Sequence, residues 1–362
     1  MVRSRRTALA VALVAAGAIA LTGCSAQATA TSGSSASSST ASGKKEAITL
    51  YAAEGYDSSV PKAFTAKTGI PVKVDDDSTG PLLTKIQAEK NNPQWTMLWV
   101  DGDQAFASLD QQGMLAKVTP SASFNAQGQK LQPSDHAYVA TGTTLMAALI
   151  YNAAKTSSVP KTYQDLLGSA YQGKVGMNDP AQSGPTYPFI AGLMNQLGGQ
   201  SNGISKGEAY FTSLKANGLK VFPTNGDTLH ALETGQIDYG LIQSSAAVGE
   251  TLKVKPTATY DPKIVYLPEA TLLPSVIGVD KAADPTQQAE AKQFIDFALS
   301  AEGQKAMQAG DPTGDSLFYP VVTGTQPLSG VPAFPSQYQR ISPTFWGSKE
   351  SEIVSWFEQN IK

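Results

Sequence analysis

The sequence is poor in the residue types that form disulfides and metal clusters. It contains one cysteine and two histidines, His136 and His230, in 362 residues. A single cysteine excludes an intramolecular disulfide and any cysteine-cluster metal site. The two histidines lie far apart and show no HxxxH or HxH spacing, so we expect both to be structural or exposed. We therefore expect neither a resident metal nor a cofactor.

Charge of either sign is also scarce. Charged residues make up 16% of the chain, and the net charge is −3. No basic stripe is present that would neutralise phosphates, which argues against nucleic acid as a partner. The chain also has no GxSxG elbow, no HExxH and no plausible Ser/His/Asp set. We predict that the protein is not an enzyme, with an exported hydrolase as a remote alternative.

Long apolar runs are missing except at the amino terminus. Arg3, Arg5 and Arg6 precede an apolar segment over residues 8–20, which is too short to span a bilayer stably. The sequence LTGC at residues 21–24 then fits the bacterial lipobox, in which the cysteine is acylated and becomes the first residue. This pattern predicts a signal peptide over 1–23 and lipidation of Cys24. The alternative is a plain signal peptide with an incidental cysteine.

The segment after the leader consists almost entirely of Ser, Ala, Thr and Gly. It cannot bury enough apolar surface to offset its ordering entropy, so residues 24–45 are predicted to be a flexible tether. The full chain is 41% hydrophobic, and the part that follows the tether is long enough to bury a large core. A lipidated cysteine, a flexible tether and a folded part in this order predict a protein that is held at the outer face of a membrane. Residues 4–9, SRRTAL, are similar to a twin-arginine export signal, so the export route stays open.

Residues 48–74 predict a βαβ unit. The alternating ITLY is typical of a strand, and the loop AAEGY leads to cap residues and a helix that ends at Gly69. Residues 70–74 then form a second strand. Such a unit implies a parallel sheet. Ligands of open α/β sheets bind outside the carboxyl ends of the strands, so the loop at 52–57 is expected at a site.

Several motifs in order resemble one protein family. FTAKTGI at 64–70, KTYQDLL at 161–167, YQGKVGMNDP at 171–180 and FIDFALSAEGQ at 294–304 are similar to segments of extracellular solute-binding proteins of bacterial ABC importers. The branch in question holds ferric-iron, phosphonate, thiamine and polyamine binders. The resemblance runs from about residue 48 to about residue 322.

The resemblance implies an α/β, type II periplasmic-binding-protein fold, in which a ligand cleft separates two lobes joined by two crossing strands. The first crossing strand would end in IYN at 150–152, and the second would cover 270–279. Lobe 1 is then expected over 46–145 and 275–362, and lobe 2 over 146–274. The tail over 328–362 is predicted to form a docked helix that covers the first lobe.

Two helix starts carry the predicted site. Ser78, Thr79 and Gly80 precede a helix, and the sequence SGPT at 183–186 repeats this arrangement in the other half of the chain. Free N–H groups at such helix starts bind anions. Ordinary capping without a ligand is the alternative. We expect the two helix starts to close on one anionic or oxygen-rich solute.

Acidic residues complete the prediction. Glu54 or Asp101 is placed to pair with an amine, whereas Asp103 suits a helix cap, and the acids at 75–77 suit solvated surface. Trp99 is expected in the core. The candidate ligand-binding residues are Ala53, Glu54, Tyr56, Ser78, Thr79, Gly80, Asp101, Ser183, Gly184, Thr186, Asn225 and Ser244.

The predicted function follows from the resemblance and these residues. We expect a lipid-anchored, monomeric receptor that captures a small solute, such as an aminoalkylphosphonate, by lobe closure and delivers it to a membrane permease. The alternative is ferric iron, bound with an anion and oxygens of Tyr56, Asp101 or Tyr187. Ser244 and Ser245 stand where the iron binders carry adjacent tyrosines, which puts the usual mode of iron binding in doubt.

Overall fold

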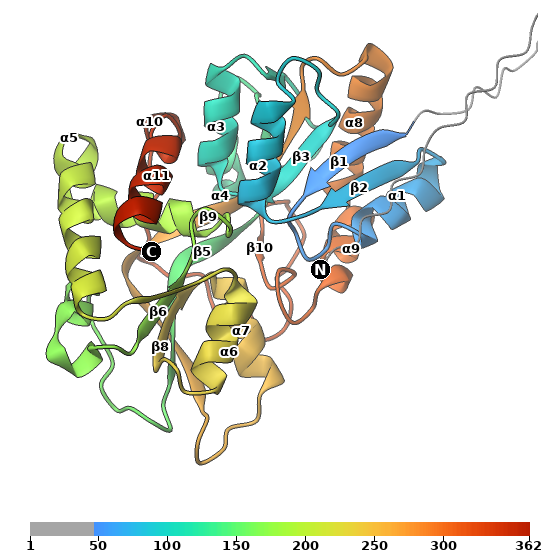
Figure 1. The fold of residues 1–362 in the computed structure, drawn as a ribbon. Coiled ribbons are helices and arrows are strands. Elements are labelled where there is room, and N and C mark those ends of the chain that lie inside the picture. The colour runs from blue at the N-terminus through green and yellow to red at the C-terminus, as the bar shows by residue number, and fades with distance from the viewer. Residues whose placement is uncertain (1–46) are drawn as a thin grey trace, which may run out of the picture. The chain divides into compact units, whose positions relative to one another are not determined.

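The structure is a computed structural model that describes residues 47–362 (Figure 1). The predicted signal peptide, Cys24 and the whole predicted tether lie outside the described residues. Within residues 47–362, no helix is both long and apolar enough to cross a membrane. The folded part is a mixed α/β structure built on one continuous sheet with the strand order β2-β1-β3-β9-β5-β8-β6-β7.

The first lobe begins with the predicted βαβ unit. Strand β1 pairs in parallel with both β2 and β3, and helix α1 ends at Gly69, which adopts the left-handed conformation (φ 71°) that favours glycine. The parallel sheet predicted from residues 48–74 is therefore confirmed. The elements of this part are β1 (Ile48–Ala52), α1 (Ser59–Thr68), β2 (Val72–Asp76), α2 (Thr79–Ala88), β3 (Met97–Asp101), α3 (Asp103–Gln111), β4 (Leu115–Ala116) and α4 (Ala126–Leu131).

Two long strands connect the lobes. Strand β5 (Val139–Asn152) and strand β9 (Pro262–Asp280) run antiparallel from the pair Val139 and Ile277 to the pair Asn152 and Pro262, with two shifts in register. The expected second crossing strand over 270–279 is thus the carboxyl-terminal part of a longer strand. Because both strands belong to the sheets of both lobes, they position the two halves of the site.

The second lobe repeats the parallel α/β arrangement. Strand β6 pairs in parallel with β7 and with β8, and β8 pairs with β5. The lobe contains two 3₁₀ turns (Tyr163–Leu167 and Ser169–Tyr171), β6 (Val175–Asn178), α5 (Thr186–Ala216), β7 (Lys220–Phe222), α6 (Asn225–Glu233), β8 (Tyr239–Ile242) and α7 (Ser244–Lys253). Helix α5 is interrupted at Gly199, where φ is 62°.

The chain then returns to the first lobe through α8 (Pro285–Ala298), α9 (Ala301–Gly310) and β10 (Tyr319–Pro320). Phe64 of α1 packs edge-on against Phe294 of α8, and Phe294 also contacts Trp99 of β3. Trp99 is fully buried in this cluster, and its indole Nε1 donates to Thr141 and Ser275. The expectation that Trp99 belongs to the core is confirmed.

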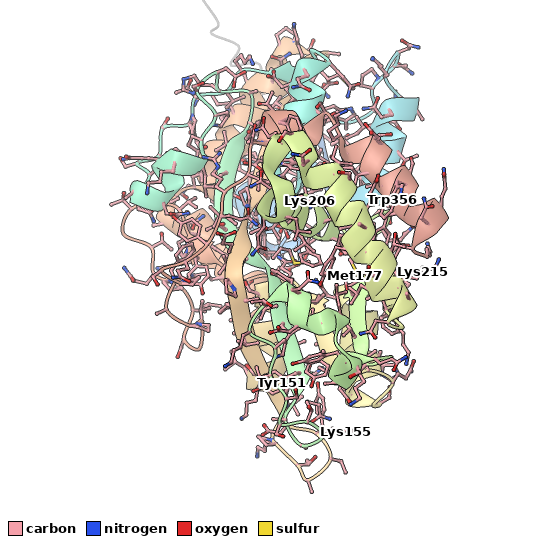
Figure 2. The ribbon with its side chains drawn as sticks, turned by 90° about the vertical axis from the view of Figure 1, so that its left-hand side faces the viewer. Tyr151, Lys155, Met177, Lys206, Lys215 and Trp356 are labelled. Atoms are coloured by element: carbon pink, nitrogen blue, oxygen red, sulfur yellow. The ribbon has the colours of Figure 1, made fainter. Side chains whose placement is uncertain are left out.

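The carboxyl-terminal tail differs from its prediction. It forms α10 (Pro343–Gly347), which packs on α3, and α11 (Glu350–Asn360), which packs on α5 of the second lobe. Figure 2 shows Trp356 of α11 near α5, which carries Lys206 and Lys215. The tail therefore does not simply cover the first lobe. The reason is its apolar face, since Trp346, Ile353 and Phe357 join the buried cluster of the second lobe.

Candidate functional site

A cavity of about 180 Å³ lies between the two lobes, at the carboxyl ends of their strands. Both lobes contribute to its wall. It is lined by Ala53, Ser78, Thr79, Asp101, Gln182, Ser183, Gly184, Pro185, Thr224, Asn225, Gly226, Gln243 and Asp315.

The topology of the sheet explains why these residues meet. Ala53 follows β1, Asp101 ends β3, and Gln243 follows β8, so each lies where a strand delivers the chain to the cleft. A larger cavity of about 440 Å³ is lined mainly by side chains of α2, α3 and α11. We place the site in the smaller cavity because strand ends and helix starts of both lobes converge there.

Helix N-termini form one part of the wall. Helices α2, α5 and α6 all begin beside the cavity. The start of α6 is closed by a capping box between Thr224 and Asp227, but neither Ser78 before α2 nor Pro185 before α5 supplies a side-chain cap. The first N–H groups of a helix have no intrahelical acceptor, so helix starts attract anionic oxygens. In α2 the Gly80 N–H already donates to the Gln182 carbonyl, in α5 the Thr186 N–H donates to the Ser183 carbonyl, and Pro81 and Pro188 carry no N–H.

Carboxyl groups form another part of the wall and its surroundings. Asp315 Oδ2 accepts a hydrogen bond from the Gly55 N–H (2.9 Å), and Glu54 Oε1 accepts one from Ser275 Oγ (2.6 Å). Among residues 47–362, no lysine, arginine or histidine lines the cavity. Asp101, Asp315 and the adjacent Glu54 therefore place carboxyl groups at the cleft, with no cationic side chain of the described residues in its wall.

Burial explains the electrostatics of these acids. Burial, and next the nearby Asp101, raises the pKa of Glu54 well above its usual range. Burial and the charge of Asp315 raise the pKa of Asp101 in the same way. Burial also raises the pKa of Asp315 to about 6. A cationic ligand group would favour the ionised forms of all three, because it supplies the opposite charge that the wall lacks.

A chain of polar side chains links the lobes behind the cavity. Thr228 Oγ1 donates to Asn178 Oδ1 (2.7 Å), and Asn178 Nδ2 donates to Asn225 Oδ1 (2.6 Å). Gln243 Nε2 then donates to Asp101 Oδ2 (2.8 Å). These hydrogen bonds thus hold Asn225 and Asp101 in defined orientations.

The structure brings together part of the predicted set. Residues from both halves of the chain line the cavity, as the prediction of a shared cleft requires: Ala53, Ser78, Thr79, Asp101, Ser183, Gly184 and Asn225.

The other predicted residues do not line the cavity. Glu54 lies beside it, and Ser244 Oγ accepts a hydrogen bond from the buried Leu145 N–H. Gly80 contacts the opposite lobe, where its N–H donates to the Gln182 carbonyl (3.3 Å). Thr186 is fully buried in the first turn of α5.

The tyrosines considered for iron also lie outside the wall. The Tyr56 hydroxyl is hydrogen bonded to Ser275 Oγ (2.9 Å) in the core, and the Tyr187 hydroxyl donates to the Trp346 carbonyl. Among residues 47–362, no group of three or more His, Cys, Asp or Glu side chains is arranged to hold a metal. Asp103, expected as a helix cap, is the first residue of α3 and pairs with Arg340 (3.4 Å).

The predicted set lacks four polar residues of the wall, namely Gln182, Thr224, Gln243 and Asp315. Gln243 directly follows β8 and lies next to the predicted Ser244. Asp315 lies between α9 and β10, in a loop that no strand-end rule singles out. Its sequence signal is only the polar, glycine-containing run DPTGDS at 311–316.

The chain matches known proteins over most of its length. Residues 60–328 match the family of bacterial extracellular solute-binding proteins. A periplasmic protein of Salmonella paratyphi A, named for binding 2-aminoethylphosphonate, is 24% identical over 252 residues, which cover 67% of this chain and 68% of that protein.

Solved structures share the fold. The iron-bound HitA of Pseudomonas aeruginosa superposes with a TM-score of 0.71 at 24% identity, covering 86% of this chain and 98% of HitA. AfuA of Actinobacillus pleuropneumoniae, with fructose-6-phosphate bound, gives a TM-score of 0.73 at 19% identity, covering 88% of this chain and 99% of AfuA. These similarities establish the two-lobed, type II periplasmic-binding fold that the sequence predicted.

Proposed function

The chain belongs to the family of bacterial extracellular solute-binding proteins, and we propose that its own solute is a small zwitterion with a phosphonate-like anion at one end and an amine at the other. Its relatives are binding proteins of ABC transporters rather than enzymes. What remains to be assigned is therefore the ligand, the residues that hold it, the membrane anchor and the permease.

One observation carries the proposal: the same small cavity combines the starts of α2 and α5, which lack side-chain caps, with acidic side chains, and no basic side chain in the described part of the chain lines it. The starts of α2 and α5 suit the oxygens of the anionic end. Asp101 and Asp315 suit the ammonium end, because a buried carboxylate needs an opposite charge. A purely anionic solute would meet repulsion from these two acids, and a purely cationic one would leave the helix starts without an anion.

The size of the cavity agrees with a small solute. At about 180 Å³ it is smaller than the roughly 300–1,000 Å³ of pockets that take drug-sized ligands. An aminoalkylphosphonate has both charged ends within a few bonds of each other. The Salmonella paratyphi A relative named for 2-aminoethylphosphonate supports this solute class.

Capture is proposed to work by closure of the lobes. A solute that touches α2 of the first lobe and α5 of the second binds the closed form more tightly than the open one, so it shifts the population toward closure. The closed form would then dock on a membrane permease as a monomer. We further propose that acylated Cys24 anchors the protein after export, and that residues 24–45 tether it. Detergent-phase partitioning of the unsubstituted protein, with loss of partitioning in Cys24→Ser, tests the anchor.

Isothermal titration calorimetry tests the ligand class. The full chain with Cys24→Ser is titrated with 2-aminoethylphosphonate, with ethylphosphonate and with ethanolamine. We expect the zwitterion to bind at least tenfold more tightly than either half-ligand, because each of those leaves one side of the site unpaired. Equal affinity for ethylphosphonate and 2-aminoethylphosphonate would refute the role assigned to the acids.

A further inference from the structure

Two glycines lie at contacts between the lobes. Gly80, in the first turn of α2, donates its N–H to the Gln182 carbonyl of the second lobe (3.3 Å). A Cβ on Gly80 would lie 1.9 Å from the Ala181 carbonyl oxygen. Such a distance is far inside van der Waals contact with a backbone atom that cannot turn aside. Position 80 therefore tolerates only a hydrogen in this arrangement of the lobes.

Gly184 makes the reciprocal contact from the second lobe. A Cβ on Gly184 would lie 2.3 Å from Thr79 Oγ1 and 2.7 Å from Thr79 Cβ, which belong to the first lobe. Thus Gly80 of α2 faces the segment that leads into α5, and Gly184 of that segment faces Thr79 at the start of α2.

The need for glycine at these positions comes from the opposite lobe alone. Neither Gly80 nor Gly184 has a positive φ, so its own backbone does not require glycine. The nearest atoms to each added Cβ all belong to the other lobe. In an open form, alanine would fit at either position without strain. At position 80 it would also favour the helix, since glycine is a poor helix former.

We propose that Gly80 and Gly184 are specificity-determining residues that set how far the lobes close. This rests on the proposed function, because it assigns the closed cleft to solute capture. A methyl group at either position holds the start of α2 and the 181–184 segment apart. The cavity then stays wider than about 180 Å³, and the two helix starts no longer reach the same small anion. The bare glycines thus select for small solutes.

Pulsed electron paramagnetic resonance on spin labels measures closure directly. In the full chain with Cys24→Ser, labels are placed at the exposed positions Lys90→Cys, beyond α2, and His230→Cys, on α6. The label distances are recorded with and without 2-aminoethylphosphonate. We expect a short-distance population in the parent protein that is lost in Gly80→Ala and in Gly184→Ala. A tenfold fall in the closed fraction weakens the apparent affinity about tenfold.

Two further variants separate closure from folding. The double variant Thr79→Gly/Gly184→Ala removes the Thr79 side chain that the added methyl group at position 184 would strike. It should therefore regain the short-distance population that Gly184→Ala loses. In the control Ala88→Ser, a small change at an exposed position of α2 outside the cavity wall, the closed population should persist. The melting temperature of ligand-free Gly80→Ala should equal or exceed that of the parent, whereas its ligand-induced rise should disappear.

The outcomes distinguish this inference from the proposed function. The inference is overturned if the closed population is the same in the parent and in Gly80→Ala, or if neither protein shows one. This holds even if calorimetry shows tight binding of 2-aminoethylphosphonate. A closed population that the glycine variants lose, together with no binding of 2-aminoethylphosphonate to the parent, supports the closure limit and refutes the proposed solute. Failure of Thr79→Gly to restore closure in Gly184→Ala would also overturn the inference.

Discussion

The side-chain amide of Gln243 donates a hydrogen bond to the carboxylate of Asp101 over 2.8 Å, and this bond joins the two lobes at the cavity. Gln243 follows β8 of the second lobe, and Asp101 ends β3 of the first. Both residues are buried. The bond favours the ionised form of Asp101 against the effect of burial, so Gln243 tunes the acid that we assign to the ligand amine.

Replacing Gln243 should therefore weaken capture. Gln243→Leu removes the donor and leaves Asp101 harder to ionise. Hydrogen bonds to charged groups contribute about 1.5–3 kcal/mol, so calorimetry should show roughly 10- to 100-fold weaker binding of 2-aminoethylphosphonate. Gln236→Leu, a change at an exposed glutamine outside the cavity wall, is the matched control and should bind normally. Unchanged affinity in Gln243→Leu would show that the bond has no part in capture.

Asp315 should decide the preference for an amine. Asp315→Asn keeps the shape of the side chain but removes its charge, so the advantage of 2-aminoethylphosphonate over ethylphosphonate should shrink at least tenfold in competition titrations. The control is Asp76→Asn, which removes one negative charge at the exposed end of β2. A preference that survives in Asp315→Asn and falls in Asp76→Asn would assign the effect to overall charge instead.

Stability and affinity should respond oppositely to pH. The acids Glu54, Asp101 and Asp315 have raised pKa values when folded, so the folded protein holds protons that the unfolded chain releases. Their contribution to stability is fully present below the unfolded pKa of about 4 and is lost as the pH rises through the folded values, about 6 for Asp315.

The melting temperature of the ligand-free protein should consequently rise as the pH is lowered from 7 to 5. Asp57 and Glu350, whose pKa values burial raises to about 7, act in the same direction. Affinity for 2-aminoethylphosphonate should fall over the same range, by about tenfold per pH unit for each proton displaced. Melting curves and calorimetry at pH 5, 6 and 7 check both trends. If melting temperature and affinity both rose, or both fell, as the pH was lowered, the assignment of the amine to these acids would be contradicted.

The tail should be integral to the fold. Trp346 is fully buried, its indole Nε1 donates to Asn195 Oδ1 (3.3 Å), and it belongs to the core cluster of the second lobe. Trp346→Ala should lower the free energy of unfolding by about 3–5 kcal/mol, as for other large buried aromatics. Trp356→Ala, at a half-buried position on α11, should cost clearly less. Urea unfolding curves compare the two, and equal losses would contradict the packing described for α10.

Ferric iron should not produce a phenolate band. The hydroxyl groups of Tyr56 and Tyr187 are engaged with Ser275 and with the Trp346 carbonyl, away from the cavity wall. Ferric citrate added to the protein should thus give no new visible absorption from ligand-to-metal charge transfer. A band that appears with iron and disappears in Tyr56→Phe or Tyr187→Phe would favour the iron alternative.

Local patterns predicted much of the fold correctly. The alternating ITLY, the stop at Gly69 and the start of α2 after Ser78 depend on residues that are neighbours in the chain, so periodicity and capping rules apply to them. The tail was placed incompletely for the opposite reason. Its apolar positions predict a docked helix but do not say which lobe offers the complementary surface.

The sequence by itself determined the family, the parallel α/β units and the existence of a helix start after Ser78 and after Ser183, because short, contiguous motifs specify each of them. Only the tertiary structure decided that Gln243 meets Asp101 across 142 residues, that Asp315 joins the same cavity, and that Gly80 and Gly184 touch the opposite lobe. These relationships depend on how β5 and β9 set one lobe against the other, and no local pattern encodes a distance between segments so far apart in the chain.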